Sequence, residues 1–469
     1  MPASPRPPEA VSTEGRLSEA EALFERRRRQ AGLFLGPLAF ALLLAFPPAG
    51  LGIPAGRLLA VVGWVLVWWI TEAVPLPLTA VLGPALAVVL GVLPARDAFA
   101  PFGDPIIFLF LGSFLLAEAM SVHGLDRRLA RAVLSVPAAS SSPRRVVLAF
   151  AAMAAAISMW ISNSATTAML YPIALGVLAT LGREVSDRPA LERSLLLACA
   201  YGSSVGGIGT PVGSPPNLVA IGQLSSLAGV RVGFVPWALV ALPILAALVV
   251  CLALVLGLPV KGNGATKTPP AARGAPTPPM SAGERSVTAA FLLTVALWVG
   301  PGLLSLVLGS GHPVPVALGR ALPEGVVAVL GASLLFVLPA ESGEERRMAL
   351  TWGEARRIDW GTLLLFGGGL SLGGAMFRTG LSEALGNGLV ETTGVSTVTG
   401  LTVVFSVFAI FFTEVTSNTA AATMLVPLAI ASASAAGVSP VEPALGCALG
   451  CSMAFMLPVA TPPNAIVYG

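Results

Sequence analysis

Apolar residues occur along this chain in long blocks separated by short polar stretches. The blocks lie at 31–48, 57–71, 76–94, 105–122, 145–181, 193–206, 233–260, 286–309, 322–340, 361–377, 396–433 and 441–459. A membrane-spanning helix takes about 20 apolar residues, so these blocks predict helices that cross or enter a bilayer. Two of them, 145–181 and 396–433, are too long for one span and hold polar clusters at their centres. Interrupted segments of this kind are typical of re-entrant hairpins and broken helices.

The composition agrees with a membrane protein. Of the 469 residues, 55% are hydrophobic and 11% are charged, whereas a soluble domain has about 25% charged residues. These values exclude a soluble enzyme, and the net charge of +3 gives no basic field for a nucleic acid. Nearly all basic residues are arginine, which is typical of a GC-rich bacterial genome. We therefore predict an all-α, polytopic protein of the lipid bilayer, located in the cytoplasmic (inner) membrane of a bacterium.

Residue types that carry metal or covalent chemistry are scarce. The four cysteines lie in apolar stretches and are predicted to be small buried residues: Cys199, Cys251, Cys447 and Cys451. His123 and His312 are too few and too far apart for a metal site. Glu414 near Ser417 is the only arrangement that suggests a nucleophile and a base. We expect no haem, iron–sulfur or zinc chemistry and no enzyme activity.

Charged and aromatic residues indicate how the chain meets the membrane surface. The run Arg26–Arg29 ends a polar segment of 30 residues and places it in the cytoplasm by the positive-inside rule. Residues 261–285 are rich in Pro, Gly and basic side chains, and they predict a flexible cytoplasmic loop between two halves. Trp68, Trp69 and Trp360 are expected at the membrane interface.

Several acidic residues lie within or beside the apolar blocks. Asp104 and Asp359 each precede a Gly-rich apolar segment and are predicted to be helix N-caps. Glu72, Glu118 and Glu414 have apolar surroundings, where acidic residues are candidates for function. For Glu72 and Glu118, a place at a helix end or at the interface is the simpler interpretation.

The two halves of the chain resemble each other at three places. The Gly-rich segment that begins at Phe110 recurs from Phe366, 256 residues later. Ser162–Ala165 recurs as Ser417–Ala420 at an offset of 255, and Ser214–Asn217 recurs as Thr461–Asn464 at an offset of 247. Because the three motifs keep their order and nearly their spacing, we predict a duplicated transporter fold whose site lies where the broken segments meet.

The polar clusters have the chemistry of a cation site. Sodium takes neutral oxygen ligands such as hydroxyls, amide oxygens and free carbonyls. Ser158, Asn163 and a carbonyl near Gly213 can form one such cage. Thr413, Asn418 and a carbonyl near Ala460 can form its counterpart in the second half.

The same clusters have the chemistry of an anion site. Asn and hydroxyl groups donate hydrogen bonds to carboxylates, and a helix that restarts after each cluster directs N–H groups at an anion. Neither cluster contains Arg or Lys, so bound cations would have to offset the anion's charge. A single cluster could merely let two helices pack closely, and each Pro-Pro could merely end a helix. The duplication of cluster and loop favours a binding site.

These motifs resemble the divalent anion/sodium symporters, which carry di- and tricarboxylates or sulfate. The resemblance rests on Trp69–Pro77, on both Ser-Asn-Ser/Thr clusters and on Leu457–Tyr468, and it covers the chain from about residue 30 onwards. It implies a homodimer with an inverted-repeat fold. Each protomer would have a scaffold and a transport domain that moves like an elevator, with two re-entrant hairpins.

The resemblance also implies site residues and domain limits. The anion would contact Ser162, Asn163, Ser164, Ser214, Ser417, Asn418, Thr419, Thr461 and Pro462. Sodium ions (Na+) would lie at Ser158, Asn163 and Gly213 and at Thr413, Asn418 and Ala460. The expected segments are 1–30 in the cytoplasm, 31–98 and 233–357 as scaffold, and 99–232 and 358–469 as transport elements.

Two departures from the family pattern affect these expectations. The first motif has Ser164 where Thr is commoner, so we expect an altered fit with the hydroxyl retained. Members of the family also continue with a final apolar helix beyond the position of Gly469. A chain that ended there would leave closure of the second cation site in doubt.

The expected function is sodium-coupled uptake of C4-dicarboxylates such as succinate, malate or fumarate. A sodium-independent dicarboxylate exchanger and a sodium-coupled citrate or sulfate transporter of the same fold are alternatives. A channel would need a continuous polar pore, whereas here the polar residues gather at two related points.

Overall fold

The computed structural model describes residues 19–134, 142–181, 188–260, 279–309, 311–341 and 347–468. Within these ranges the regular secondary structure is helical apart from an isolated bridge between Pro339 and Met348, so the all-α prediction is confirmed. Residues 1–18, residues 261–278 of the expected loop, and Gly469 lie outside the described part.

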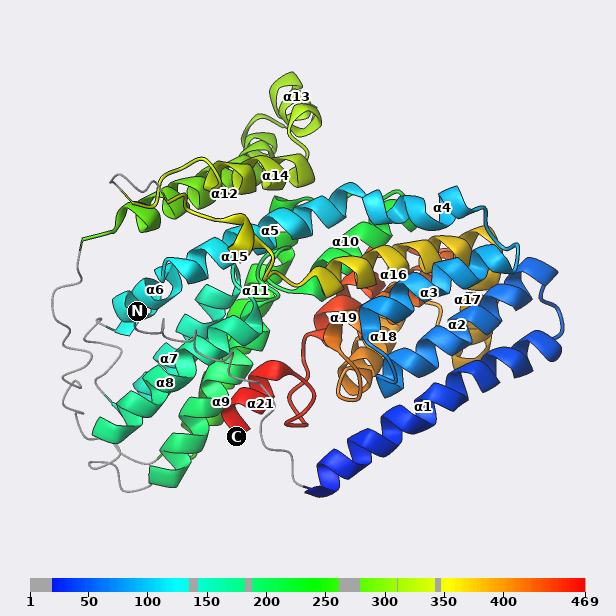
Figure 1. The fold of residues 1–469 in the computed structure, drawn as a ribbon, viewed down its shortest axis with the longest axis horizontal. Coiled ribbons are helices and arrows are strands. Elements are labelled where there is room, and N and C mark those ends of the chain that lie inside the picture. Colours follow the sequence, from blue (N-terminus) through cyan, green and yellow to red (C-terminus); the bar gives the residue numbers. More distant parts are fainter. Residues whose placement is uncertain are drawn as a thin grey trace, which may run out of the picture.

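The helices are named in chain order (Figure 1). They are α1 (Glu19–Ala45), α2 (Ile53–Thr71), α3 (Leu76–Val89), α4 (Ala95–Phe99), η1 (Ala100–Gly103), α5 (Pro105–Val122), α6 (Leu125–Leu134), α7 (Pro143–Ser158), α8 (Asn163–Leu181), α9 (Arg188–Gly206), α10 (Pro215–Ala228), α11 (Phe234–Gly257), α12 (Ala282–Leu308), α13 (Pro313–Ala321), α14 (Glu324–Leu335), α15 (Trp352–Ala355), α16 (Trp360–Arg378), α17 (Leu381–Thr393), α18 (Val398–Phe412), α19 (Asn418–Ala435), α20 (Val441–Cys451) and α21 (Pro462–Tyr468).

The helices have the lengths and surfaces of a multi-pass membrane protein. Among the described residues, six helical segments are long and apolar enough to span a bilayer, or up to eight if each bent helix pair is one span. On α11 and α12, large apolar side chains such as Leu254 (61% exposed) and Val307 (82% exposed) face outward. Such surfaces suit lipid rather than water.

Two expectations about single residues are wrong. Cys251 on α11 is exposed, whereas the other three cysteines are buried as predicted, because α11 presents one face outward. Trp69 is only 2% exposed and does not lie at an interface. Its backbone carbonyl accepts a hydrogen bond from the Thr416 hydroxyl at 3.3 Å, so α2 packs against the second polar cluster.

The structure repeats itself along the chain. The order α5 to α10 recurs as α16 to α21, with a helix break at each polar cluster. Both predicted N-caps are confirmed, since Asp104 accepts from the Ile106 N–H at 2.9 Å and Asp359 from the Thr362 N–H at 3.0 Å. The same local rules therefore begin α5 and α16.

Close helix packing extends the repeat to two further helices. A methyl group on Gly112 of α5 would overlap the backbone of Ala328 in α14, and one on Gly368 of α16 would overlap that of Ala80 in α3. Gly112 and Gly368 are separated by the offset of the Gly-rich segments, 256 residues. Thus α3 and α14 hold equivalent places. The three motifs above do not include these helices, although both contain the run Ala-Val-Leu-Gly, at 80–83 and 328–331.

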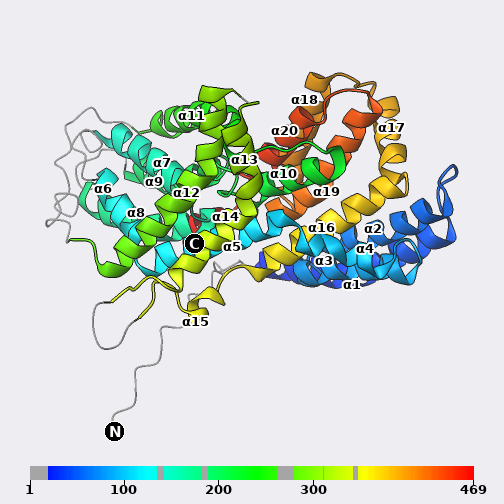
Figure 2. The same cartoon turned by 90° about the horizontal axis from the view of Figure 1, so that it is seen from above.

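In both views of the molecule, α1, α2 and α3 lie at one end and α7, α8 and α9 at the other (Figures 1 and 2). The hairpin α7–α8 and the hairpin α18–α19 belong to different repeats, yet α21 packs against α8 and α9 while α10 packs against α19. The two repeats are therefore interleaved around the middle of the molecule.

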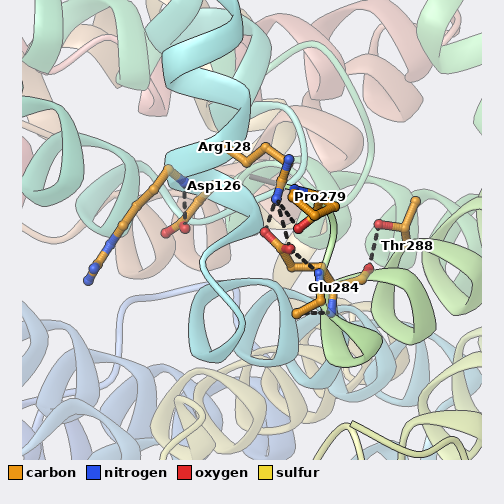
Figure 3. A network of polar contacts seen from close by, with 7 residues as sticks. Asp126, Arg128, Pro279, Glu284 and Thr288 are labelled. Atoms are coloured by element: carbon orange, nitrogen blue, oxygen red, sulfur yellow. Dashed lines mark hydrogen bonds and ion pairs between the residues drawn. The ribbon is translucent and has the colours of Figure 1, made fainter. Parts of the chain in front are cut away.

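An ion pair fastens α6 to the beginning of α12 (Figure 3). The Arg128 guanidinium donates to both carboxylate oxygens of Glu284, at 2.8 and 2.9 Å, and to the Pro279 carbonyl at 3.4 Å. Glu284 also forms a capping box with Ser281. This bidentate geometry is the strong form of an arginine–carboxylate contact, and it joins α6 to the C-terminal end of the expected loop.

Candidate functional site

A cavity of about 600 Å³ lies where the breaks of the two repeats meet. All nine residues expected to contact an anion line it: Ser162, Asn163, Ser164, Ser214, Ser417, Asn418, Thr419, Thr461 and Pro462. Gly213 and Ala460 line it as well. Ser158 and Thr413 do not reach the cavity, because both are fully buried behind its wall.

The first break places several oxygens around one point. The Ser158 hydroxyl donates to the Asn163 side-chain oxygen at 2.7 Å. A methyl group on Gly213 would lie 2.6 Å from the carbonyl oxygen of Gly207, 2.9 Å from that of Met159 and 3.1 Å from that of Ser158. These neutral oxygens come from the ends of α7 and α9, whose C-terminal dipoles attract cations.

The second break has the same pairing of a hydroxyl with an Asn side chain, 255 residues later. The Thr413 hydroxyl lies 2.7 Å from the Asn418 side-chain oxygen and 2.9 Å from the Cys451 carbonyl oxygen. Cys451 is the last residue of α20, so a helix C-terminus again supplies a carbonyl. The described residues contain no group of three or more His, Cys, Asp or Glu side chains placed to bind a metal. Both breaks therefore offer the donors that suit sodium rather than a transition metal.

Each break also begins a helix at the cavity. The Ser162 hydroxyl accepts from the Ala165 N–H, and the Ser417 hydroxyl accepts from the Ala420 N–H, both at 3.3 Å. These caps fix the first turns of α8 and α19, whose N-terminal dipole ends favour an anion. The side chains of both clusters thus lie between positive helix ends and carbonyl-rich helix ends.

The Asn of each Pro-Pro-Asn motif holds the loop that precedes it. The Asn217 amide donates to the carbonyls of Gly207 and Thr210, both at 2.8 Å. The Asn464 amide donates to the carbonyls of Ala454 and Leu457, both at 3.0 Å. Both side chains are at least 95% buried. The loops that carry Gly213 and Ala460 are therefore fixed by the same pair of bonds.

Replacing Asn217 with Ala is expected to weaken sodium activation of transport about tenfold. The change removes the side-chain donor of the buried Gly207 carbonyl, at about 1–3 kcal/mol. It leaves the Thr210 carbonyl with the Gly213 N–H at 3.3 Å and frees the loop beside Gly213. The measurement is the sodium concentration for half-maximal transport, with thermal stability in detergent measured alongside. Asn387→Ala, at an exposed position of α17, is the matched control. An unchanged sodium dependence in the Asn217 variant would contradict this loop-holding role.

The two loops differ in one respect. In the first repeat the Thr210 hydroxyl donates to the Met159 carbonyl at 2.5 Å. In the second, the buried Glu414 carboxylate accepts from the N–H groups of Met456 and Leu457, both at 2.9 Å. Glu414 therefore holds the backbone of the second loop. Its carboxylate forms these hydrogen bonds with the loop and none with Ser417.

The cavity wall carries charged residues outside the two clusters. Glu118, Arg357 and Asp359 line it, and the sequence analysis did not place Arg357 at the site. Neither cluster contains Arg or Lys, as expected, but a guanidinium does lie on the same cavity. Arg357 has no counterpart in the first repeat, so comparison of the halves could not reveal it. Its position two residues before the Asp359 cap was the available signal.

Comparisons with known proteins agree on a family. Residues 29–469 match the family described as the sodium:sulfate symporter transmembrane region. The chain is 34% identical over 451 residues to a "Sodium-dependent dicarboxylate transporter SdcS" of Staphylococcus saprophyticus, which covers 93% of this chain and 85% of that protein. A protein of the same name from Staphylococcus aureus strain USA300 is 34% identical over 455 residues, covering 93% and 84%.

A comparison of folds found the crystal structure of the Alcanivorax borkumensis YdaH transporter. It aligns with 92% of this chain and 86% of that chain, at a TM-score of 0.48 and 16% sequence identity.

Proposed function

Because this chain belongs to the sodium:sulfate symporter family, and is thus a multi-pass membrane transporter rather than an enzyme, we propose that it couples sodium entry to uptake of C4-dicarboxylates. Succinate, malate and fumarate are the proposed substrates, carried across the cytoplasmic membrane. The observation that carries the proposal is the cavity into which two Ser-Asn motifs, one from each repeat, project. The names of the two staphylococcal relatives support a dicarboxylate substrate and sodium dependence.

In the proposed coupling, the side-chain oxygen of each Asn binds sodium and its side-chain NH2 group binds the anion. The side-chain oxygens of Asn163 and Asn418 already lie 2.7 Å from the hydroxyl oxygens of Ser158 and Thr413, where a sodium ion would add to the same oxygens. The amide N–H groups then remain free to donate to a carboxylate. Sodium that orders these side chains lowers the entropy cost of binding the anion. Two carboxylates would be bound by two such clusters.

The movement that completes transport is proposed from the family resemblance. A transport domain that contains both hairpins would carry the loaded cavity past a scaffold in an elevator movement, and two protomers would form a homodimer. The interleaved packing of α10 with α19 and of α21 with α8 supports movement of both hairpins as one unit.

Competition for sodium-driven succinate uptake tests the substrate assignment. The protein is reconstituted in liposomes, and labelled succinate enters along an inward sodium gradient. We expect malate and fumarate to compete, while sulfate and citrate at the same concentration leave uptake largely unchanged. Stronger competition by citrate or sulfate would replace the C4 assignment.

A sodium-independent dicarboxylate exchanger is the second candidate, and Arg357 is the observation that favours it. A basic side chain can offset an anion's charge without a bound cation. An exchanger would take up succinate in choline when the liposomes contain unlabelled succinate, and would not do so when they are empty. The two intact neutral-oxygen cages support the sodium-coupled function instead.

A further inference from the structure

The cavity is lined by more acidic than basic residues. Among the described lining residues, Arg357 is the one cation, and Glu118 and Asp359 are the acids. A dianion in this cavity is therefore surrounded by a lining that holds two carboxylates and one guanidinium. Long-range attraction and repulsion at such a wall govern how readily a charged ligand enters.

The Arg357 backbone is held in place. Arg357 lies in the turn between α15 and α16, where its N–H donates to the Glu354 carbonyl at 2.9 Å. The next residue, Ile358, is buried, and Asp359 then caps α16. Arg357 is exposed and lines the cavity, so a fixed turn places this charged residue at the cavity.

Nearby carboxylates are largely engaged elsewhere. Asp359 accepts hydrogen bonds from the Thr362 N–H at 3.0 Å and from the Thr362 hydroxyl at 2.5 Å. Glu354 pairs with Arg347 at 2.5 Å and with Thr351. The Arg357 guanidinium has no hydrogen bond or ion pair with the described residues, although it lies close enough to Glu118 for electrostatic attraction.

We propose that Arg357 sets the preference of this cavity for dianions, by offsetting Glu118 and drawing the substrate's carboxylates toward the two Ser-Asn clusters. The inference rests on the proposed function, since it assumes that a dicarboxylate is transported. Arg357 acts on entry and affinity, and the clusters bind the substrate. Its loss therefore raises KM and leaves the maximal rate nearly unchanged.

Variants that change the charge of residues 357 and 118 test this role of Arg357. In the sodium-driven succinate assay, Arg357→Gln is expected to raise KM about tenfold, in the range of electrostatic effects on association. Arg357→Lys keeps the charge and is expected to retain most of the affinity. Glu118→Gln is expected to lower KM, and the double variant to return it toward the wild-type value. Raising the ionic strength with choline chloride at constant sodium is expected to reduce the differences in KM between the variants and the wild type.

Arg356→Gln is the matched control, because Arg356 is the adjacent exposed arginine and does not line the cavity. It removes the same charge one residue away and is expected to leave KM near the wild-type value. Equal effects of the two Gln variants, or a fall in maximal rate without a change in KM, would overturn the role of Arg357. Absence of sodium-driven uptake by the wild type would instead overturn the proposed function.

Discussion

Transport of succinate by an Asn163→Ala or Asn418→Ala variant is expected to fall about 100-fold or more. Each side-chain oxygen lies 2.7 Å from a buried hydroxyl, and both Asn residues line the cavity. One substitution removes a side chain that would bind both the cation and the anion. The loss of binding free energy is about 1–3 kcal/mol for each of these two ligands. Initial rates of sodium-driven uptake in proteoliposomes measure the loss.

A structural defect must be separated from a lost ligand. Asn387→Ala is the matched control, since Asn387 is exposed on α17, and it is expected to transport like the wild type. The Asn163 and Asn418 variants are expected to elute from size exclusion as the wild type does. Near-normal rates in either variant would show that the cages and the anion site lie elsewhere.

Gly213→Ala is expected to weaken sodium activation of transport strongly. Its methyl group would lie 2.6 Å from the Gly207 carbonyl oxygen and 2.9 Å from that of Met159. Both contacts are with backbone, so the carbonyls that would hold the cation must move apart. We expect the sodium concentration for half-maximal uptake to rise more than about tenfold, in line with the effect of displaced metal-site groups.

The chain offers controls for this substitution. Gly374 in α16 has open space beside it, so Gly374→Ala is expected to be neutral. The second repeat has Ala460 at the position of Gly213, so Ala460→Gly adds no clash and is expected to keep sodium activation within about threefold. Unaltered sodium dependence in Gly213→Ala would contradict a cation position beside this glycine.

The duplicated motifs made the site predictable. A polar cluster inside an apolar block costs free energy unless it has partners, and here the cluster, the Pro-Pro-Asn loop and the Asp cap all occur twice. The breaks before Asn163 and Asn418 and the caps at Asp104 and Asp359 follow from local rules, and the structure has them where the sequence places them.

What the sequence could not predict depends on packing between distant segments. The equivalence of α3 and α14 is shown by two backbone approaches, through Gly112 and Gly368. A four-residue match alone, Ala-Val-Leu-Gly at 80–83 and 328–331, points to it in the sequence. Trp69 is buried because α2 meets the second cluster, although its sequence position resembles that of an interface residue. Arg357 reaches the cavity only because the turn before α16 lies beside it.

Sodium-dependent uptake is the most direct test of the central claim that the two Ser-Asn cages couple a cation to a dicarboxylate. Labelled succinate is offered to proteoliposomes with an inward sodium gradient, or with choline in place of sodium, with no internal dicarboxylate. We predict accumulation above the equilibrium level with sodium and none with choline. Equal uptake in both conditions would contradict sodium coupling and leave the cages without their proposed role.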